Sequence, residues 1–479
     1  MALLRLNLLG LLLAMPLCAQ TMTLSTYYGG YGSTSGTAIA TDAIGNAFQV
    51  SSTSSSMPCT GGLTGAQNVV VSMINNAWGL NWCTYLGGVN TDYGYGIALD
   101  ASDNVYVVGM TNSPGLGTPG AYQTQLLGTN DAFVAELSSN GTLLWLTYLG
   151  KAASSQANSV YVDAAGGIYI TGYTTGNGWP VAGSVRQKNF GGGPWDIVVA
   201  KLNPGGSSLA WSGYLGGSRE DVGYRLAVSP DGSLACLAGY TSSPNYPTTA
   251  GAFQRTKNAV RAGVVTCLTA STGATVASTY FGGTTTSTQP CNACAAGLTF
   301  DASGNVWIVG LAQQEAGFPI TPDAVQPDYA GGLHDAFISE LTTYLSTVLY
   351  STWFGGNSDD GAVAPAFDAY GNLWIHGNTF SKDLPVSPNA FQPKRGGRAF
   401  ASDAFLIEFS PTTNTVEYST YLGGSGNEFG GATQSLAIGP GCVWFTGWTL
   451  STDLPLVHPI EATMQGTQEA FVAELDTLP

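Results

Sequence analysis

The chain has 479 residues, of which only 9 % are charged, 11 % are aromatic and 65 are glycine. Its formal net charge of -16 argues against nucleic acid or an anionic membrane surface as a partner, because both need a basic protein surface. Few charges combined with many Gly, Ser, Thr and aromatic residues favour short strands and tight turns over helices or disorder. We therefore expect an all-β protein.

The first 19 residues have the pattern of a secretory signal peptide. One arginine is followed by an apolar run that is too short to cross a bilayer, and then by small residues that end at Ala19. We expect cleavage near Ala19 and a secreted, periplasmic or cell-surface protein. Cys18 raises the alternative of a lipid anchor, but Leu17 stands where a small residue is usual. No later segment is long and apolar enough to predict a transmembrane helix.

A short string, "STYYGG" at Ser25–Gly30, is the first of seven similar copies. The others begin at Cys83, Leu146, Ser212, Ser278, Ser351 and Ser419. Three further strings recur in step with it, as in "GIALD" (96–100), "NVYVVGMT" (104–111) and "DAFVAEL" (131–137). Each is a β-branched and aromatic run bounded by turn residues, which predicts a strand. Four strands in a period of roughly 60 to 70 residues are typical of a propeller blade.

The count of strings predicts a seven-bladed β-propeller of four-stranded blades over residues 20–479. The first "STYYGG" precedes the first complete unit, and the last unit ends near Leu475 without a fourth strand of its own. We therefore expect an N-terminal strand to complete the last blade, which removes an open sheet edge. The expected units span residues 31–88, 89–150, 151–217, 218–283, 284–356, 357–424, and 425–479 together with 21–30.

Function in such a scaffold is expected in the loops of one face, including the long loops 112–130, 174–194, 241–261 and 379–402. Acidic residues recur on the same face, just after the "GG" of the opening string, namely Asp92, Glu220, Asp221, Asp359, Asp360 and Glu428. They predict a partial acidic ring at the axial mouth, which would bind a divalent cation such as calcium or a basic ligand. The alternative is that they cap turns and keep the protein soluble.

The other polar and aromatic residues fall into two groups, those that recur with the repeat and those that do not. Acidic residues begin the third strand of five units (Asp131, Asp196, Asp335, Asp403 and Glu469), and their regularity favours a structural bond to the blade backbone. His334, His376 and His458 do not recur. Trp195 and Tyr329 are also less periodic and could stack on a sugar ring. The sequence contains no recognisable hydrolase or metalloprotease motif.

Seven cysteines remain after residue 19, so an odd number leaves at least one thiol unpaired. Cys236 and Cys267 are predicted on neighbouring strands and could form a disulfide. The "CNAC" string at 291–294 could be half of a zinc site, a local disulfide, or two free thiols.

The strings taken together resemble the bacterial SBBP repeat, most closely in "YLGGVNTDYGYGIALDASDNVYVVGMT" (85–111) and also in residues 421–449. The first of these is also similar to repeats of NHL-type propellers. The resemblance implies an exported or cell-surface bacterial protein, and it supplies no common catalytic residues.

Two functional hypotheses follow. The favoured one is an exported, non-catalytic and monomeric scaffold that binds protein or glycan through its loop face. The alternative is a propeller lyase or glycoside hydrolase that uses the axial acidic groups with His376.

Overall fold

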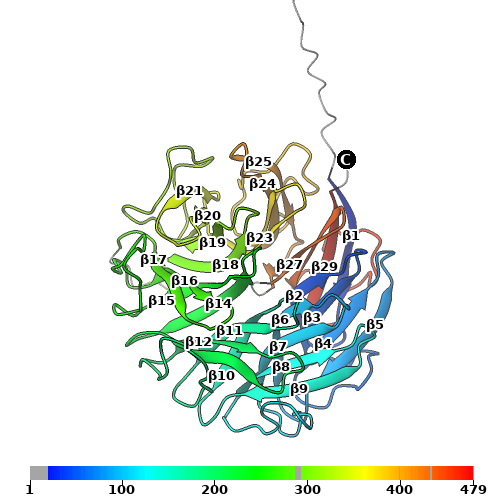
Figure 1. The fold of residues 1–479 in the computed structure, drawn as a ribbon. Coiled ribbons are helices and arrows are strands. Elements are labelled where there is room, and N and C mark those ends of the chain that lie inside the picture. The colour runs from blue at the N-terminus through cyan, green and yellow to red at the C-terminus, as the bar shows by residue number, and fades with distance from the viewer. Residues whose placement is uncertain (1–19, 286–292, 399, 432–433, 478–479) are drawn as a thin grey trace, which may run out of the picture.

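The computed structural model describes residues 20–285, 293–398, 400–431 and 434–477. The predicted signal peptide, residues 1–19, lies outside them. The strands form seven antiparallel sheets arranged as blades around a central axis (Figure 1), and the described part contains no helix. It accordingly contains no helix long and apolar enough to cross a membrane. The predicted seven-bladed propeller is confirmed.

Each blade has an inner, second, third and outer strand in chain order. Blade 1 consists of β2 (Thr34–Thr41), β3 (Ala47–Thr53), β4 (Asn68–Ile74) and β5 (Leu80–Leu86). Blade 2 consists of β6 (Asp92–Leu99), β7 (Val105–Thr111), β8 (Asp131–Leu137) and β9 (Leu143–Leu149). Blade 3 consists of β10 (Ser155–Val162), β11 (Ile168–Thr174), β12 (Asp196–Leu202) and β13 (Leu209–Leu215). Blades 4 and 5 consist of β14 (Asp221–Val228), β15 (Leu234–Thr241), β16 (Ala262–Thr269) and β17 (Thr275–Phe281); and β18 (Ala293–Phe300), β19 (Val306–Ala312), β20 (Asp335–Leu341) and β21 (Val348–Phe354). Blades 6 and 7 consist of β22 (Asp360–Phe367), β23 (Leu373–Thr379), β24 (Asp403–Ser410) and β25 (Thr415–Leu422); and β26 (Glu428–Gly430), β27 (Leu436–Gly439), β28 (Cys442–Thr449), β29 (Glu469–Asp476) and β1 (Thr21–Tyr28).

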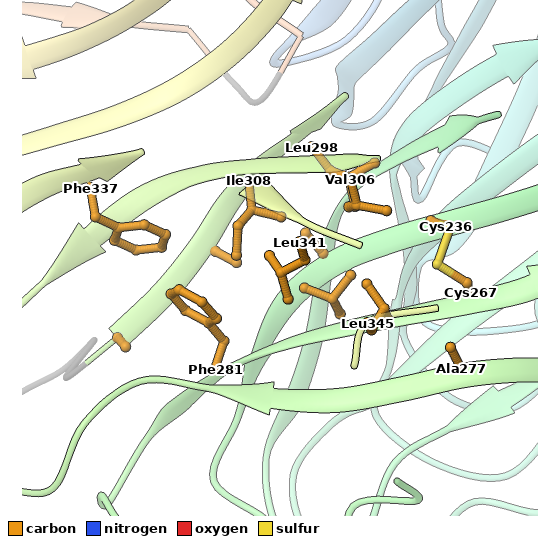
Figure 2. Close-up of a cluster of buried hydrophobic side chains, with 14 of the residues drawn as sticks. Cys236, Cys267, Ala277, Phe281, Leu298, Val306, Ile308, Phe337, Leu341 and Leu345 are labelled. Carbon is orange, nitrogen blue, oxygen red and sulfur yellow. A yellow bond between two sulfur atoms is a disulfide. The ribbon is translucent and has the colours of Figure 1, made fainter. Parts of the chain in front are cut away.

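The hydrophobic core lies between neighbouring blades. The second and third strands are buried along almost their whole length, because both faces of a blade pack against other blades. Figure 2 shows one such layer, in which Phe281 of blade 4 meets Ile308 and Phe337 of blade 5. The Phe281 and Phe337 rings are stacked with their centroids 5.4 Å apart.

The ring is closed by the N-terminal strand, as the displaced first copy of the string predicts. β1 pairs antiparallel with β29, with Tyr27 opposite Phe471, and Figure 1 shows the two ends of the chain side by side in blue and red. Tyr27 and Tyr28 are both buried. The outer strand of the last blade is therefore made from residues 21–28, which precede the first blade in the sequence.

The inner strand of each blade carries a bulge near the middle of its length. In blades 1 to 6 one extra residue is bulged, namely Thr37, Tyr95, Asn158, Tyr224, Ala296 and Val363. In blade 7 the inner strand is split into β26 and β27: Gly430 pairs with Gly447 and Leu436 pairs with Phe445. Between these two pairs the sequence has five residues on the inner side and one residue, Thr446, on β28. The corresponding stretch of blade 2 has two residues (95–96) opposite Val108, so blade 7 carries three additional residues.

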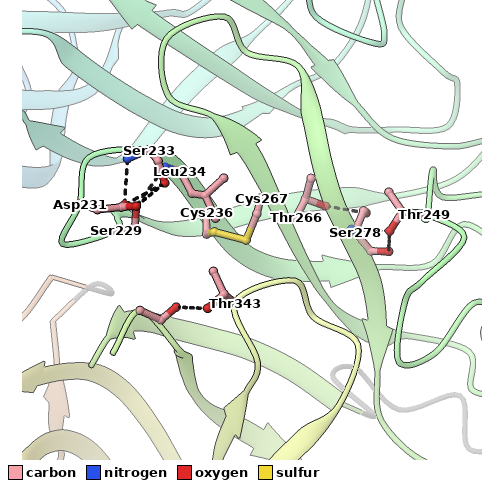
Figure 3. Close-up of a disulfide and its surroundings, with 11 residues drawn as sticks. Ser229, Asp231, Ser233, Leu234, Cys236, Thr249, Thr266, Cys267, Ser278 and Thr343 are labelled. Atoms are coloured by element: carbon pink, nitrogen blue, oxygen red, sulfur yellow. Dashed lines mark hydrogen bonds between the residues drawn. A yellow bond between two sulfur atoms is a disulfide. The ribbon is translucent and has the colours of Figure 1, made fainter. Parts of the chain in front are cut away.

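Two disulfides have both of their cysteines among the described residues. Cys236 and Cys267 pair as predicted, across β15 and β16, beside the turn that Asp231 holds (Figure 3). Cys59 pairs with Cys83, a bond that the sequence did not indicate. Cys294 is also disulfide-bonded, so it is neither a free thiol nor a zinc ligand, while Cys291 lies outside the described residues. Cys442 is unpaired and buried.

Candidate functional site

The acidic residues after the "GG" pair lie in the seam, which is the junction where the outer strand of one blade passes to the inner strand of the next. The backbone N–H of Gly217 donates to Asp221 Oδ2 at 2.8 Å, and Ser243 Oγ donates to the same oxygen at 2.9 Å. Thr241 donates to the other oxygen. The same arrangement holds at three more seams, through the pairs Gly88–Asp92, Gly356–Asp360 and Gly424–Glu428.

These four seam carboxyls do not form the open acidic ring that the sequence predicts. Each is at most 2 % exposed, and each accepts its hydrogen bonds inside its own seam or blade. Burial raises the pKa of Asp221 and Asp360 to about 6 and that of Glu428 to about 7. Across the described residues, no three or more His, Cys, Asp or Glu side chains are grouped so as to hold a metal ion. The geometry gives these four residues a structural role.

The other two predicted acidic residues reach the surface at separate places. Glu220 accepts a hydrogen bond from Tyr240 Oη at 2.8 Å and pairs with Arg261 at the same distance. Asp359 has a 43 % exposed side chain, 4.0 Å from His334 Nδ1, and it lines a separate hollow between blades 5 and 6 with Lys382.

The acidic residues that begin the third strands form the predicted backbone bonds. Asp131 accepts from the N–H groups of Leu127 and Gly128 at 2.8 and 3.0 Å. Asp403 and Glu469 close their own loops in the same way, through the N–H groups of Gly396, Gly397, Gln465 and Gly466. Their regular spacing therefore reflects the closing of the long loops.

The second glycine of the seam is required by close packing. A Cβ at Gly217 would lie 2.5 Å from Asn245 Oδ1 and 2.6 Å from Ser243 Cβ, whereas a Cβ at Gly251 would meet nothing within 4 Å. We expect Gly217→Ala to lower the free energy of unfolding by about 1–3 kcal/mol, the usual cost of overpacking. Gly251→Ala should be close to neutral in the same thermal or denaturant unfolding experiment. Equal stability of the two variants would contradict this role of the seam.

His334 lies beside Asp359, whereas His376 and His458 do not join the predicted acidic residues. His376 is fully buried in β23, where its Nδ1 lies 3.0 Å from Ser435 Oγ, and burial lowers its pKa to about 3. His458 stacks on Trp78, with ring centroids 4.9 Å apart. A buried neutral imidazole away from the surface cannot exchange protons with a bound substrate, so His376 does not fit the role that the enzymatic hypothesis gave it.

The clearest hollow lies at the axial mouth on the long-loop face, over blades 2, 3 and 4. We call it the aromatic hollow; it has a volume of about 410 Å³ and is lined by Tyr95, Gln156, Asn158, Tyr173, Trp195, Val222, Tyr224 and Tyr240. The bulged inner-strand residues supply three of these side chains. Tyr173 and Tyr240 are the last residues but one of their second strands, and Trp195 directly precedes β12. The hollow is therefore built by strand ends of a rigid scaffold.

The aromatic rings and amides of this hollow hold one another in place. Tyr173 lies 5.6 Å from Trp195, and Tyr224 lies 5.7 Å from Tyr240, measured between ring centroids. A chain of hydrogen bonds runs along the wall. Tyr173 Oη donates to Gln156 Oε1 at 3.0 Å, and Gln156 Nε2 donates to Asn158 Oδ1 at 2.6 Å. The wall thus presents fixed aromatic faces beside oriented amides, with no charged side chain in the lining.

The sequence predicts only part of this site. Trp195 was singled out and lies in the hollow, whereas Tyr329 packs edge-on against Trp353, 5.3 Å away within blade 5. Tyr95, Tyr173, Tyr224 and Tyr240 stand inside repeat strings and were not singled out. One feature of the sequence does distinguish this site. The second strand of most blades ends in Thr, and the residue before this Thr is aromatic in only three blades, as Tyr173, Tyr240 and Trp448.

Residues 81–115 and 144–178 match the model of the SBBP family, described as a β-propeller repeat. None of the curated proteins is a match for the chain. Several solved structures are similar to this chain at low identity. Hydrazine synthase of Kuenenia stuttgartiensis is 10 % identical with a TM-score of 0.42, over 81 % of this chain and 95 % of that one. A protein of unknown function from Dyadobacter fermentans is 9 % identical with a TM-score of 0.39, over 78 % and 97 %. A putative 6-phosphogluconolactonase from Bacteroides uniformis is 10 % identical with a TM-score of 0.37, over 79 % and 82 %.

Proposed function

We propose that this seven-bladed propeller, in which two segments match the SBBP repeat, is an exported, non-catalytic protein that binds neutral carbohydrate in the aromatic hollow. The observation that carries the proposal is the lining, in which five aromatic side chains surround two oriented amides. A sugar ring offers C–H groups that pack on aromatic faces and hydroxyls that pair with amides.

The absence of charged side chains from the lining favours neutral ligands over ionic ones. Gln156 and Asn158 are uncharged, and the nearest acidic side chain, Glu220, is already paired with Arg261. A hollow without a free charge favours a neutral ligand, because an ionic ligand would lose hydration without gaining a counter-ion. The volume of about 410 Å³ lies within the range of small-molecule pockets, about 300–1,000 Å³.

Catalysis is not part of the proposal, because the acidic groups and His376 that the hydrolase or lyase alternative uses do not line this hollow. The four seam carboxyls are buried outside the lining, and His376 is fully buried in blade 6. Export rests on the pattern of residues 1–19, and N-terminal sequencing of the mature protein tests it.

The proposal is tested by titrating the full mature chain with neutral sugars and measuring binding by calorimetry and tryptophan fluorescence. Trp195→Ala should weaken binding about tenfold or more, since a central aromatic anchor dominates the energy of such a site. The control is Tyr370→Ala; Tyr370 is 72 % exposed in the turn between the inner and second strands of blade 6, at the opposite end of the strands. It should bind as the unchanged protein does.

Two results would overturn the proposal. One is a wild-type protein that binds no neutral sugar across a broad glycan panel. The other is tighter binding of tetramethylammonium than of any sugar, because an aromatic hollow can also bind quaternary ammonium groups by cation–π contacts.

A further inference from the structure

We infer that the axial mouth holds an oligosaccharide in two adjoining subsites that share Tyr95; this inference rests on the proposed function. The first subsite is the aromatic hollow. The second hollow, of about 350 Å³, lies over blades 7, 1 and 2 and is lined by Ser35, Gly36, Thr37, Ser52, Gln67, Tyr93, Tyr95, Gly430, Gly431 and Trp448.

The two hollows have the same chemistry. The second offers the rings of Tyr93 and Trp448, the hydroxyls of Ser35 and Thr37 and the amide of Gln67, again without a charged side chain. Trp448 is held by stacking on Phe429, with ring centroids 4.7 Å apart. It occupies the same strand position in blade 7 that Tyr173 and Tyr240 occupy in blades 3 and 4. One kind of ligand unit therefore suits both hollows.

Tyr95 joins the hollows into one arc. It is the bulged residue of blade 2 and lines both of them, and its ring stacks on Tyr93 with centroids 6.1 Å apart and an interplanar angle of 10°. The lining residues follow the blades in order from 7 through 1, 2 and 3 to 4. A linear ligand can thus lie along the arc with consecutive units on either side of Tyr95.

Gln434, which lies in the stretch between β26 and β27 of blade 7, closes the channel beneath this arc. Gln434 Nε2 donates to the carbonyl oxygens of Ile97 at 3.2 Å and Val160 at 3.0 Å, and the N–H of Ile39 donates to the Gln434 carbonyl at 2.9 Å. Gln434 therefore bridges blade 7 to blades 1, 2 and 3. Ile97 and Val160 lie two residues further along their strands than Tyr95 and Asn158, so the side chain forms a floor below the hollows.

The floor formed by Gln434 determines in which direction a bound ligand can extend. Because Gln434 is 6 % exposed and bonded to three blades, a ligand at the mouth cannot continue down the axis and must extend sideways along the arc. Each hollow is near the small end of the range for ligand pockets, so one suits a single ring and the pair suits a chain.

The test is calorimetric titration of the full mature chain with three series of one to five sugar units: β-1,4-glucose, α-1,4-glucose and β-1,4-N-acetylglucosamine. We expect the Kd to fall about tenfold or more between one unit and three in at least one series. Trp448→Ala should remove this gain and restrict binding of the single unit to the aromatic hollow, whereas Trp195→Ala should weaken binding at every length. Trp448→Phe, which keeps a ring on Phe429, should retain most of the gain and shows that the site still folds.

The outcomes separate the two proposals. Binding that is equal at all lengths, or a gain that survives Trp448→Ala, would overturn the two-subsite inference while the proposed function stands. No binding at any length in any series would overturn the proposed function itself.

Discussion

Deletion of residues 21–30 is expected to lower the Tm by about 5 °C or more and to cause aggregation. The deletion removes β1, so the third strand of blade 7, β29, becomes an open edge with unpaired backbone groups. It also removes Leu24, Tyr27 and Tyr28, each at most 1 % exposed. Burying such side chains contributes about 1.5–3 kcal/mol each, and each kcal/mol corresponds to roughly 1 °C in a domain of this size. Differential scanning calorimetry and light scattering measure the two effects.

A point variant separates ring closure from the loss of chain. Tyr27 Oη donates to the Ser451 carbonyl at 2.8 Å and accepts from the Leu454 N–H at 3.0 Å, so it ties β1 to a loop of blade 7. Tyr27→Ala should cost about 3–5 kcal/mol, as for other buried aromatic truncations. Tyr31→Ala is the control, since Tyr31 is 84 % exposed. A Tm unchanged by the deletion or by Tyr27→Ala would show that the ring does not depend on this strand.

The blades were predictable because the repeated residues make the same contacts in most units. The tyrosine of "STYLGG" illustrates this: Tyr421 Oη donates to the Ser381 carbonyl at 3.0 Å and accepts from the Leu384 N–H at 2.9 Å. Ser381 Oγ in turn donates to Asp360 at 2.8 Å. Tyrosine, serine, acid and glycine must therefore recur together, and that common recurrence is what the sequence displays.

The same regularity misled the interpretation of the acidic residues. Carboxylates that recur on one face of a propeller predict a ring around its axis. Whether they are buried depends on hydrogen-bond partners about 20 residues further along the chain, which the spacing alone does not identify. Asp221, for example, is satisfied by Thr241 and Ser243 at the end of the next strand. The sequence repeats a Thr followed two residues later by a Ser, at Thr111, Thr379 and Thr449. This pattern could not be linked to the acidic residues until the strand register showed that the two sets lie side by side.

The binding site was less predictable because it is made by departures from the repeat. Tyr95 and Tyr224 reach the mouth only because each is bulged from its inner strand, and a bulge cannot be placed without the pairing register. The floor formed by Gln434 depends on three additional residues in blade 7, which alter the spacing but not the motif. Trp195 was accessible to sequence reasoning because it stands outside the repeated strings.

Stability should fall as the pH rises from 5 to 8, by about 5 °C or more in Tm. Burial raises the pKa of Asp360 and Asp403 to about 6 and of Asp196, Asp335 and Glu428 to about 7. In the unfolded chain these groups titrate near 4. The folded protein therefore binds protons more tightly, so their contribution is fully present below about pH 4 and is lost as the pH rises through 6 to 7. His376 acts with the opposite sign, since its lowered pKa favours unfolding below about pH 6.5, but it is one group against several.

Thermal unfolding of the full mature chain at pH 5, 6, 7 and 8 and constant ionic strength measures this dependence. Asp360→Asn and Glu428→Gln each remove one titrating seam group, so each should reduce the slope of Tm against pH, whatever it does to Tm at pH 5. Asp231→Asn is the control: Asp231 lies in the turn between β14 and β15, and hydrogen bonds from Ser229 and Ser233 lower its pKa to about 2. It is already ionised throughout the range, so its removal should leave the slope unchanged. A Tm that rises from pH 5 to pH 8 would mean that the seam carboxylates are stabilised in their charged form by the N–H and hydroxyl donors around them, and that these bonds outweigh burial.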